Sequence, residues 1–147
     1  MIDISNKSIT ERLASASGII RLNDDAFSSI INLNNKKGDV LNTARIAGIH
    51  AAKQTSNLIP LAHNISINSV EVEFELNEAS REIYSTVTVK SEGKTGVEIE
   101  ALTAVQISLM TIYDMCKYLD RAMEITNVRL LTKTGGKSGD YRVNKDD

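Results

Sequence analysis

The sequence is poor in the residues that mark several large protein classes. It has one cysteine, one proline, no tryptophan, four tyrosines and two phenylalanines in 147 residues. A lone cysteine excludes an internal disulfide framework and suits a reducing compartment. The scarcity of aromatic rings and the net charge of −2 argue against a nucleic-acid-binding protein. No apolar run is long and uncharged enough to span a membrane, so we expect a cytoplasmic protein that acts on neither nucleic acid nor membranes.

The patterns that are present predict one mixed domain over residues 1–147, with polar, mobile ends at about 1–10 and 141–147. We expect strands at 15–22, 70–76, 83–90 and 128–132, and helices at 26–33, at 40–56 and from about residue 96 through the apolar run 101–113. The helices must cover one face of a largely antiparallel sheet. The predicted fold class is therefore α+β, and the architecture is ferredoxin-like.

Three short polar motifs predict where the helices begin. Asn23, followed by two aspartates, is a start signal for the first helix, and Asp39 is a start signal for the second. Thr95 and Glu98 have the spacing of a capping box just before the third helix. We therefore expect Glu98 to act as a capping residue.

The third helix carries the most informative stretch of the chain. Residues 101–113 have no charge, and Asp114 and Lys117 follow at once on one helical stripe. A helix this apolar is normally buried, and an acid and a base at its end are costly unless they pair or take part in chemistry. The simpler alternative is an ion pair three residues apart at a solvated helix end.

Three loops combine lysine with glycine and are candidate phosphate sites. Gly93-Lys94-Thr95 and Gly136-Lys137-Ser138 resemble the end of a P-loop, but each lacks the glycine that would complete the motif. Lys36-Lys37-Gly38 precedes a helix start, where backbone N–H groups and the helix dipole favour anions. Each loop alone is typical of a solvated turn; the three together favour a phosphorylated small molecule as ligand.

The histidines and the cysteine offer little support for a metal site. His50 and His63 occur without a cysteine pair or a zinc-type spacing, so we predict no protein-bound metal. His63, in the loop after the proline, is the better candidate for proton exchange with a ligand, and His50 is expected to be a surface residue. Cys116 lies on the apolar helix and is expected to be a small core residue.

Six motifs follow one another along the chain: Lys37–Val40, Thr43–Ile49, Leu58–His63, Gly93–Thr103, Leu109–Lys117 and Gly135–Asp140. Together they resemble one known family, the MoaC family of cyclic pyranopterin monophosphate synthases in molybdenum cofactor biosynthesis. The resemblance covers about residues 10–143. The family usually reads Leu-Cys-His-Pro where this chain has Leu61-Ala62-His63-Asn64, so the histidine is kept and the proline is not.

The resemblance implies a reaction and a set of site residues. The substrate would be (8S)-3′,8-cyclo-7,8-dihydroguanosine 5′-triphosphate, a cyclised nucleotide derived from GTP, and acid/base catalysis by a lyase would yield cyclic pyranopterin monophosphate and diphosphate. Asp114, Lys117 and Lys37 would be catalytic. Leu61, Ala62, His63, Ile99 and Glu100 would line the base pocket. Arg45, Lys53, Lys133 and Lys137 would bind phosphates.

The resemblance also implies assembly, a homo-hexamer built as a trimer of dimers with each site at a dimer interface. We expect Lys37 and Lys117 to reach that site from different chains. No cofactor is expected, although a divalent metal ion bound with the triphosphate stays open. The alternative function is a non-catalytic, ferredoxin-like regulatory module that binds a nucleotide or a folate-like ligand.

Overall fold

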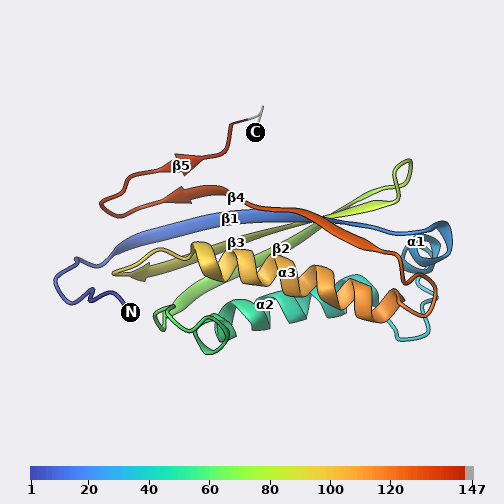
Figure 1. Cartoon of the computed structure of the whole chain (residues 1–147), viewed down its shortest axis with the longest axis horizontal. Helices are drawn as coiled ribbons and strands as arrows, with labels where there is room; N and C mark the ends of the chain where they lie inside the picture. Colours follow the sequence, from blue (N-terminus) through green and yellow to red (C-terminus); the bar gives the residue numbers. More distant parts are fainter. Residues whose placement is uncertain (145–147) are drawn as a thin grey trace.

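The computed structural model describes residues 1–144 as one long sheet with three helices (Figure 1). The last three residues of the expected polar end lie outside the described part. The elements in chain order are β1 (Thr10–Arg21), α1 (Asp24–Ile31), α2 (Val40–Leu58), β2 (Ile67–Asn77), β3 (Glu82–Gly93), α3 (Glu98–Cys116), β4 (Glu124–Thr134) and β5 (Tyr141–Arg142).

The sheet has the strand order β2-β3-β1-β4-β5, and all its pairings are antiparallel. Helices α2 and α3 lie side by side across one face of the sheet, and α1 lies at one end (Figure 1). This arrangement confirms the predicted ferredoxin-like α+β fold. Among the described residues, no helix is both long enough and apolar enough to cross a membrane.

Small residues on the inner face of β1 set how closely α3 approaches the sheet. Ala14, Ala16 and Ile20 alternate toward the helices and are fully buried. A Cβ atom on Gly18 of the same strand would come within 2.8 Å of Leu109 Cδ1 of α3. A larger residue at this position would push the helix away from the sheet. Strand β1 therefore fixes the position of α3 and of the side chains at both ends of that helix.

Two of the three predicted helix starts are confirmed. Asn23 Oδ1 accepts a hydrogen bond from Ala26 N at 2.9 Å, and Asp39 Oδ1 accepts one from Asn42 N at 3.0 Å. The capping box before α3 is wrong, because α3 has no side-chain cap. The Glu98 carboxylate instead forms an ion pair with Lys133 of β4 at 2.5 Å, an interaction with a distant strand that local spacing does not reveal.

The strands extend beyond their predicted limits at several ends. Strand β1 begins at Thr10, five residues before the expected start. The charged side chains near its beginning, Glu11 and Arg12, mask the alternation of apolar and polar residues. Strand β4 likewise begins earlier, at Glu124. The polar end after residue 140 contains β5, a two-residue strand paired with β4.

Candidate functional site

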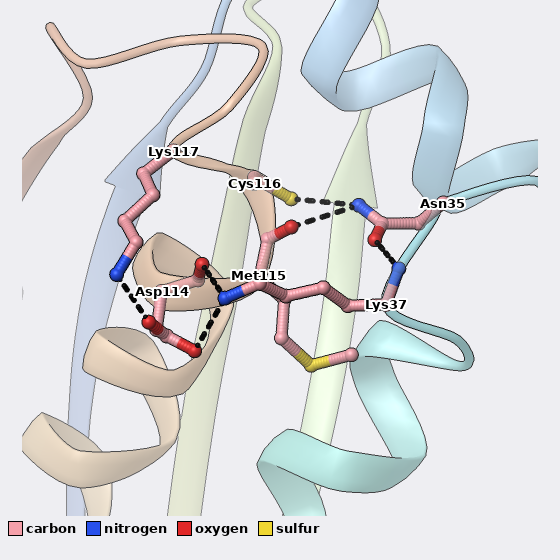
Figure 2. Close-up of polar contacts among 6 residues, drawn as sticks. All are labelled: Asn35, Lys37, Asp114, Met115, Cys116 and Lys117. Carbon is pink, nitrogen blue, oxygen red and sulfur yellow. Dashed lines mark hydrogen bonds and ion pairs between the residues drawn. The ribbon is translucent and has the colours of Figure 1, made fainter.

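A cluster of three charged side chains lies at the C-terminal end of α3 (Figure 2). Asp114 occupies the last turn of the helix and Lys117 is the residue that caps it. Lys117 Nζ donates to Asp114 Oδ1 at 2.6 Å, and Lys37 Nζ donates to Asp114 Oδ2 at 3.0 Å and to its backbone oxygen at 2.9 Å. One carboxylate is thus held between two ammonium groups.

The two ammonium groups keep Asp114 ionised at the surface. Hydrogen bonds from Lys117 and then from Lys37 lower the pKa of Asp114 below its usual value. The Asp114 side chain is 55% exposed, so its contact with Lys117 has the geometry of the simpler alternative, an ion pair three residues apart at a solvated helix end. Met110, one turn earlier on the same stripe, is also exposed.

The loop between α1 and α2 brings Lys37 to this cluster. Gly38, the next residue, has a φ of 111°, in the left-handed region where a side chain is unfavourable. Asp39 then caps α2. Lys37 therefore lies two residues before the Asp39 cap of α2, and its side chain reaches the end of α3.

A second group of predicted residues lines a pocket at the other end of α3. This pocket has a volume of about 330 Å³ and is bounded by the loop after α2, the first turn of α3 and the first residues of the chain. All five residues assigned to the base pocket line it: Leu61, Ala62, His63, Ile99 and Glu100. The structure thus brings together residues that lie up to 39 positions apart in the sequence.

Two polar side chains line this pocket. Glu100 is 3% exposed, and its burial raises the pKa of the carboxyl above its usual value. His63 Nε2 lies 2.8 Å from the backbone oxygen of Ile2. The N-terminal segment therefore forms one wall of the pocket and holds the imidazole, a contact that sequence patterns did not predict.

Next to this pocket lies a hollow that is rich in cationic side chains. It has a volume of about 340 Å³ and lies between the start of β1 and the turn after β4. Arg12 and Lys137 line it together with Thr10, whose buried Oγ1 has no hydrogen-bond partner among the described residues. Its lining is completed by Lys7, Ser8, Gly136 and Ser138.

Sequence reasoning identified Lys137 for this hollow but missed Arg12. A signal for Arg12 was present, because it has the same parity as the buried Ala14 and Ala16 on β1. A cationic side chain on the inner face of a strand is uncommon, and Arg12 is only 8% exposed. Its Nε donates to the backbone oxygen of Gly93 at 3.3 Å.

The other predicted phosphate ligands lie in three different places. Lys133 is close to the hollow, since its Nζ contacts Ser138 Oγ at 3.3 Å as well as Glu98. Lys53 is exposed and lines a separate groove beside the start of β2. The Arg45 guanidinium donates to the backbone oxygen of Val72 at 3.1 Å and lies over the ring of Phe74, so the structure does not bring it to either pocket.

The charged cluster and the two pockets are at opposite ends of α3. Glu100 is on its first turn and Asp114 on its last, and the helix rise of 1.5 Å per residue puts about 20 Å between them. A single chain therefore does not join the cluster to the pockets. Lys37 and Lys117 contact the same Asp114 within one chain, so the expectation that they come from different chains is wrong.

Comparisons with known proteins agree on one assignment. The model of the MoaC family matches residues 1–136. A protein of Clostridium botulinum (strain Alaska E43 / Type E3) named cyclic pyranopterin monophosphate synthase is 57% identical over 141 residues, which cover 96% of this chain and 89% of that protein. A protein of Staphylococcus carnosus (strain TM300) with the same name is 51% identical over 143 residues, covering 97% and 89%.

Proposed function

This chain belongs to the MoaC family, and from that premise we propose that it is a cyclic pyranopterin monophosphate synthase of molybdenum cofactor biosynthesis. It converts (8S)-3′,8-cyclo-7,8-dihydroguanosine 5′-triphosphate to cyclic pyranopterin monophosphate with release of diphosphate. The enzyme is a lyase. The names of its relatives are those of enzymes, so they do not support the alternative of a non-catalytic binding module.

The reaction needs proton transfers and the stabilisation of a leaving diphosphate. The purine and sugar rearrange into a pyranopterin, and a sugar hydroxyl loses its proton as its oxygen attacks the α-phosphorus. The bond from that phosphorus to the bridging oxygen breaks, and diphosphate leaves with the electron pair. A base, an acid and cationic groups are therefore required.

The observation that carries the catalytic assignment is the pairing of two ammonium groups with one exposed carboxylate. Asp114 is ionised and accessible, so it can accept a proton from a substrate hydroxyl. Lys117 and Lys37 carry acidic N–H groups, which can protonate substrate atoms or stabilise developing negative charge. The cluster therefore places a proton acceptor and two proton donors within hydrogen-bonding distance of one another.

We assign substrate recognition to the two pockets at the other end of α3. A guanine ring presents N–H donors along one edge, and the buried Glu100 carboxyl offers oxygen acceptors for them, while Leu61 and Ile99 supply apolar contact. The triphosphate would lie in the neighbouring hollow against Arg12 and Lys137. These side chains recognise and neutralise the substrate, and we propose that no cofactor is needed.

We propose that each complete site is shared between two chains of a homo-hexamer arranged as a trimer of dimers. The support is the separation of about 20 Å between the two halves of the site, which exceeds the reach of any side chain. An antiparallel pairing of two chains would bring the cluster of one to the pockets of the other. Ile46 on α2 and Met110 on α3 are 67% and 56% exposed and offer apolar surface for such contact.

The function is tested by release of diphosphate from the cyclised nucleotide by the purified protein. The wild-type protein should release one diphosphate per cyclic pyranopterin monophosphate formed, and Lys117→Ala should release none above background. We also assign the reaction to the cytoplasm, and fractionation of the source cells tests that assignment. A wild-type protein that binds the nucleotide without releasing diphosphate would contradict the proposed function.

A further inference from the structure

The loop that carries Lys37 is tied to the end of α3 by three consecutive residues. Figure 2 shows the Asn35 side chain reaching from this loop to the backbone and sulfur of the last helical residues. Asn35 Nδ2 donates to Met115 O at 3.2 Å and contacts Cys116 Sγ at 3.6 Å. Lys36 N donates to Tyr118 Oη at 2.9 Å, and Lys37 Nζ binds Asp114.

The Asn35 amide uses both of its ends in this connection. Its oxygen accepts a hydrogen bond from Lys37 N at 2.9 Å, and its nitrogen also contacts Ser29 Oγ of α1 at 3.2 Å. The residue is 8% exposed, so these bonds are shielded from water. Water therefore does not readily replace a lost partner, and losing one costs stability. One side chain thus fixes the Lys37 backbone relative to both α1 and the end of α3.

A lysine needs this kind of support more than most catalytic groups do. Its ammonium group sits on a flexible four-carbon stem, and Lys37 is 41% exposed, so packing alone does not hold it. Small displacements of a reacting group lower rates strongly. Without a fixed backbone, the Lys37 ammonium would be bonded to Asp114 for part of the time and to water for the rest.

We propose that Asn35 is a positioning residue, which holds the Lys37 loop against the last turn of α3 and thereby sets the contact between Lys37 and Asp114. Tyr118 is its second, weaker support, through the bond to Lys36 N and through its ring, whose centroid lies 5.4 Å from Lys36 Nζ. The inference rests on the proposed function, because it matters for catalysis only if Lys37 and Asp114 act on the substrate.

The test compares Asn35→Ala and Tyr118→Phe with two matched variants. Asn23→Ala removes an asparagine that also bonds a carbonyl, Leu119 O at 3.0 Å, but that does not contact the Lys37 loop. Tyr84→Phe removes a tyrosine hydroxyl that contacts Glu82 on β3, away from the cluster. Tyr118 is 39% exposed, so Tyr118→Phe should fold even if Asn35→Ala proves too unstable to purify.

Steady-state kinetics of diphosphate release gives the first readout. Asn35→Ala should lower kcat by about 10- to 100-fold with KM changed less than about twofold, since only the alignment of Lys37 is lost. Tyr118→Phe should lower kcat in the same way but less. Asn23→Ala and Tyr84→Phe should keep the wild-type kcat. Equal kcat values for the test variants and their matched controls would overturn the inference.

Titration of the Asp114 carboxyl by carbon NMR gives a readout that a purely structural role would not change. The charged groups facing Asp114 in the described chain are Lys37 from the loop and Lys117 from its own helix end, and both lower its pKa. Asn35→Ala should therefore raise the pKa of Asp114. In a Lys37→Gln background, Asn35→Ala should add no further rise; an additional rise there would contradict positioning through Lys37.

The two failures can be told apart with Lys117→Ala. If Lys117→Ala turns over as fast as the wild type, the proposed catalytic cluster is wrong and the positioning role falls with it. If Lys117→Ala is inactive while Asn35→Ala and Tyr118→Phe are fully active, the cluster stands and only the positioning role is refuted.

Discussion

Replacing Gly136 with alanine should weaken phosphate binding in addition to a modest loss of fold stability. Gly136 has a φ of 84°, and a Cβ atom there would overlap the Arg12 guanidinium, lying 2.9 Å from its Cζ. Because the obstacle is the end of a flexible side chain, Arg12 can turn away at small cost to stability. It can then no longer keep its place in the hollow that we assign to the triphosphate.

The chain supplies a matched control in the same loop. Gly139 has a φ of 75°, and a Cβ atom there would meet nothing within 4 Å. Gly136→Ala and Gly139→Ala should each pay about 1–2 kcal/mol for the left-handed conformation. Only Gly136→Ala displaces Arg12, and a hydrogen bond to a charged group is worth about 1.5–3 kcal/mol, or about 10- to 150-fold in affinity.

The assay is calorimetric titration with inorganic diphosphate, paired with thermal unfolding of each variant. Gly136→Ala should raise the Kd for diphosphate at least about tenfold, and Gly139→Ala should change it by less than about twofold, while the unfolding midpoints of the two variants fall by similar amounts. Equal diphosphate affinities in the two variants would refute the placement of phosphate against Arg12.

Three further predictions follow from the charged cluster and the buried thiol. Asp114→Asn should lower turnover by at least about a hundredfold while the unfolding midpoint stays nearly unchanged, since the pairs it breaks are half-exposed. Lys117 and Lys37 lower the pKa of Asp114 in the folded state, so the stability that Asp114 contributes is present above its unfolded pKa and is lost as pH falls through its folded pKa. In pH-dependent unfolding, Lys117→Ala should therefore lose this stability at a higher pH than the wild type does. Burial raises the pKa of Cys116 to about 11, so iodoacetamide should label it only after denaturation, as peptide mass spectrometry would show.

Local patterns were sufficient for the fold. Alternating strands and the caps at Asn23 and Asp39 depend on neighbours within a few positions, and these predictions are confirmed. The capping role of Glu98 failed because a partner 35 positions away, Lys133, competes for its carboxylate. No pattern within a few residues carries that information.

The arrangement of the site could not be predicted from the residues alone. Helix periodicity placed Asp114 and Lys117 on one stripe but did not show that this stripe faces solvent, because burial depends on how α3 packs on the sheet and on α2. The resemblance grouped Lys37 with Asp114, but the sequence did not show that the two side chains meet within one chain, or that the first residues of the chain meet His63. Those contacts require the complete fold.

The central claim, a site shared between two chains, is tested most directly by mixing inactive variants. The double variant Arg12→Ala/Lys137→Ala loses the pocket end and Lys117→Ala loses the cluster end; co-refolded in equal amounts, half of the dimers should pair one of each. Each such dimer has one intact site, so the mixture should recover about one quarter of wild-type turnover. Lys37→Ala mixed with Lys117→Ala should stay inactive, since both changes damage the same end. A first mixture as inactive as its parents would contradict the shared site.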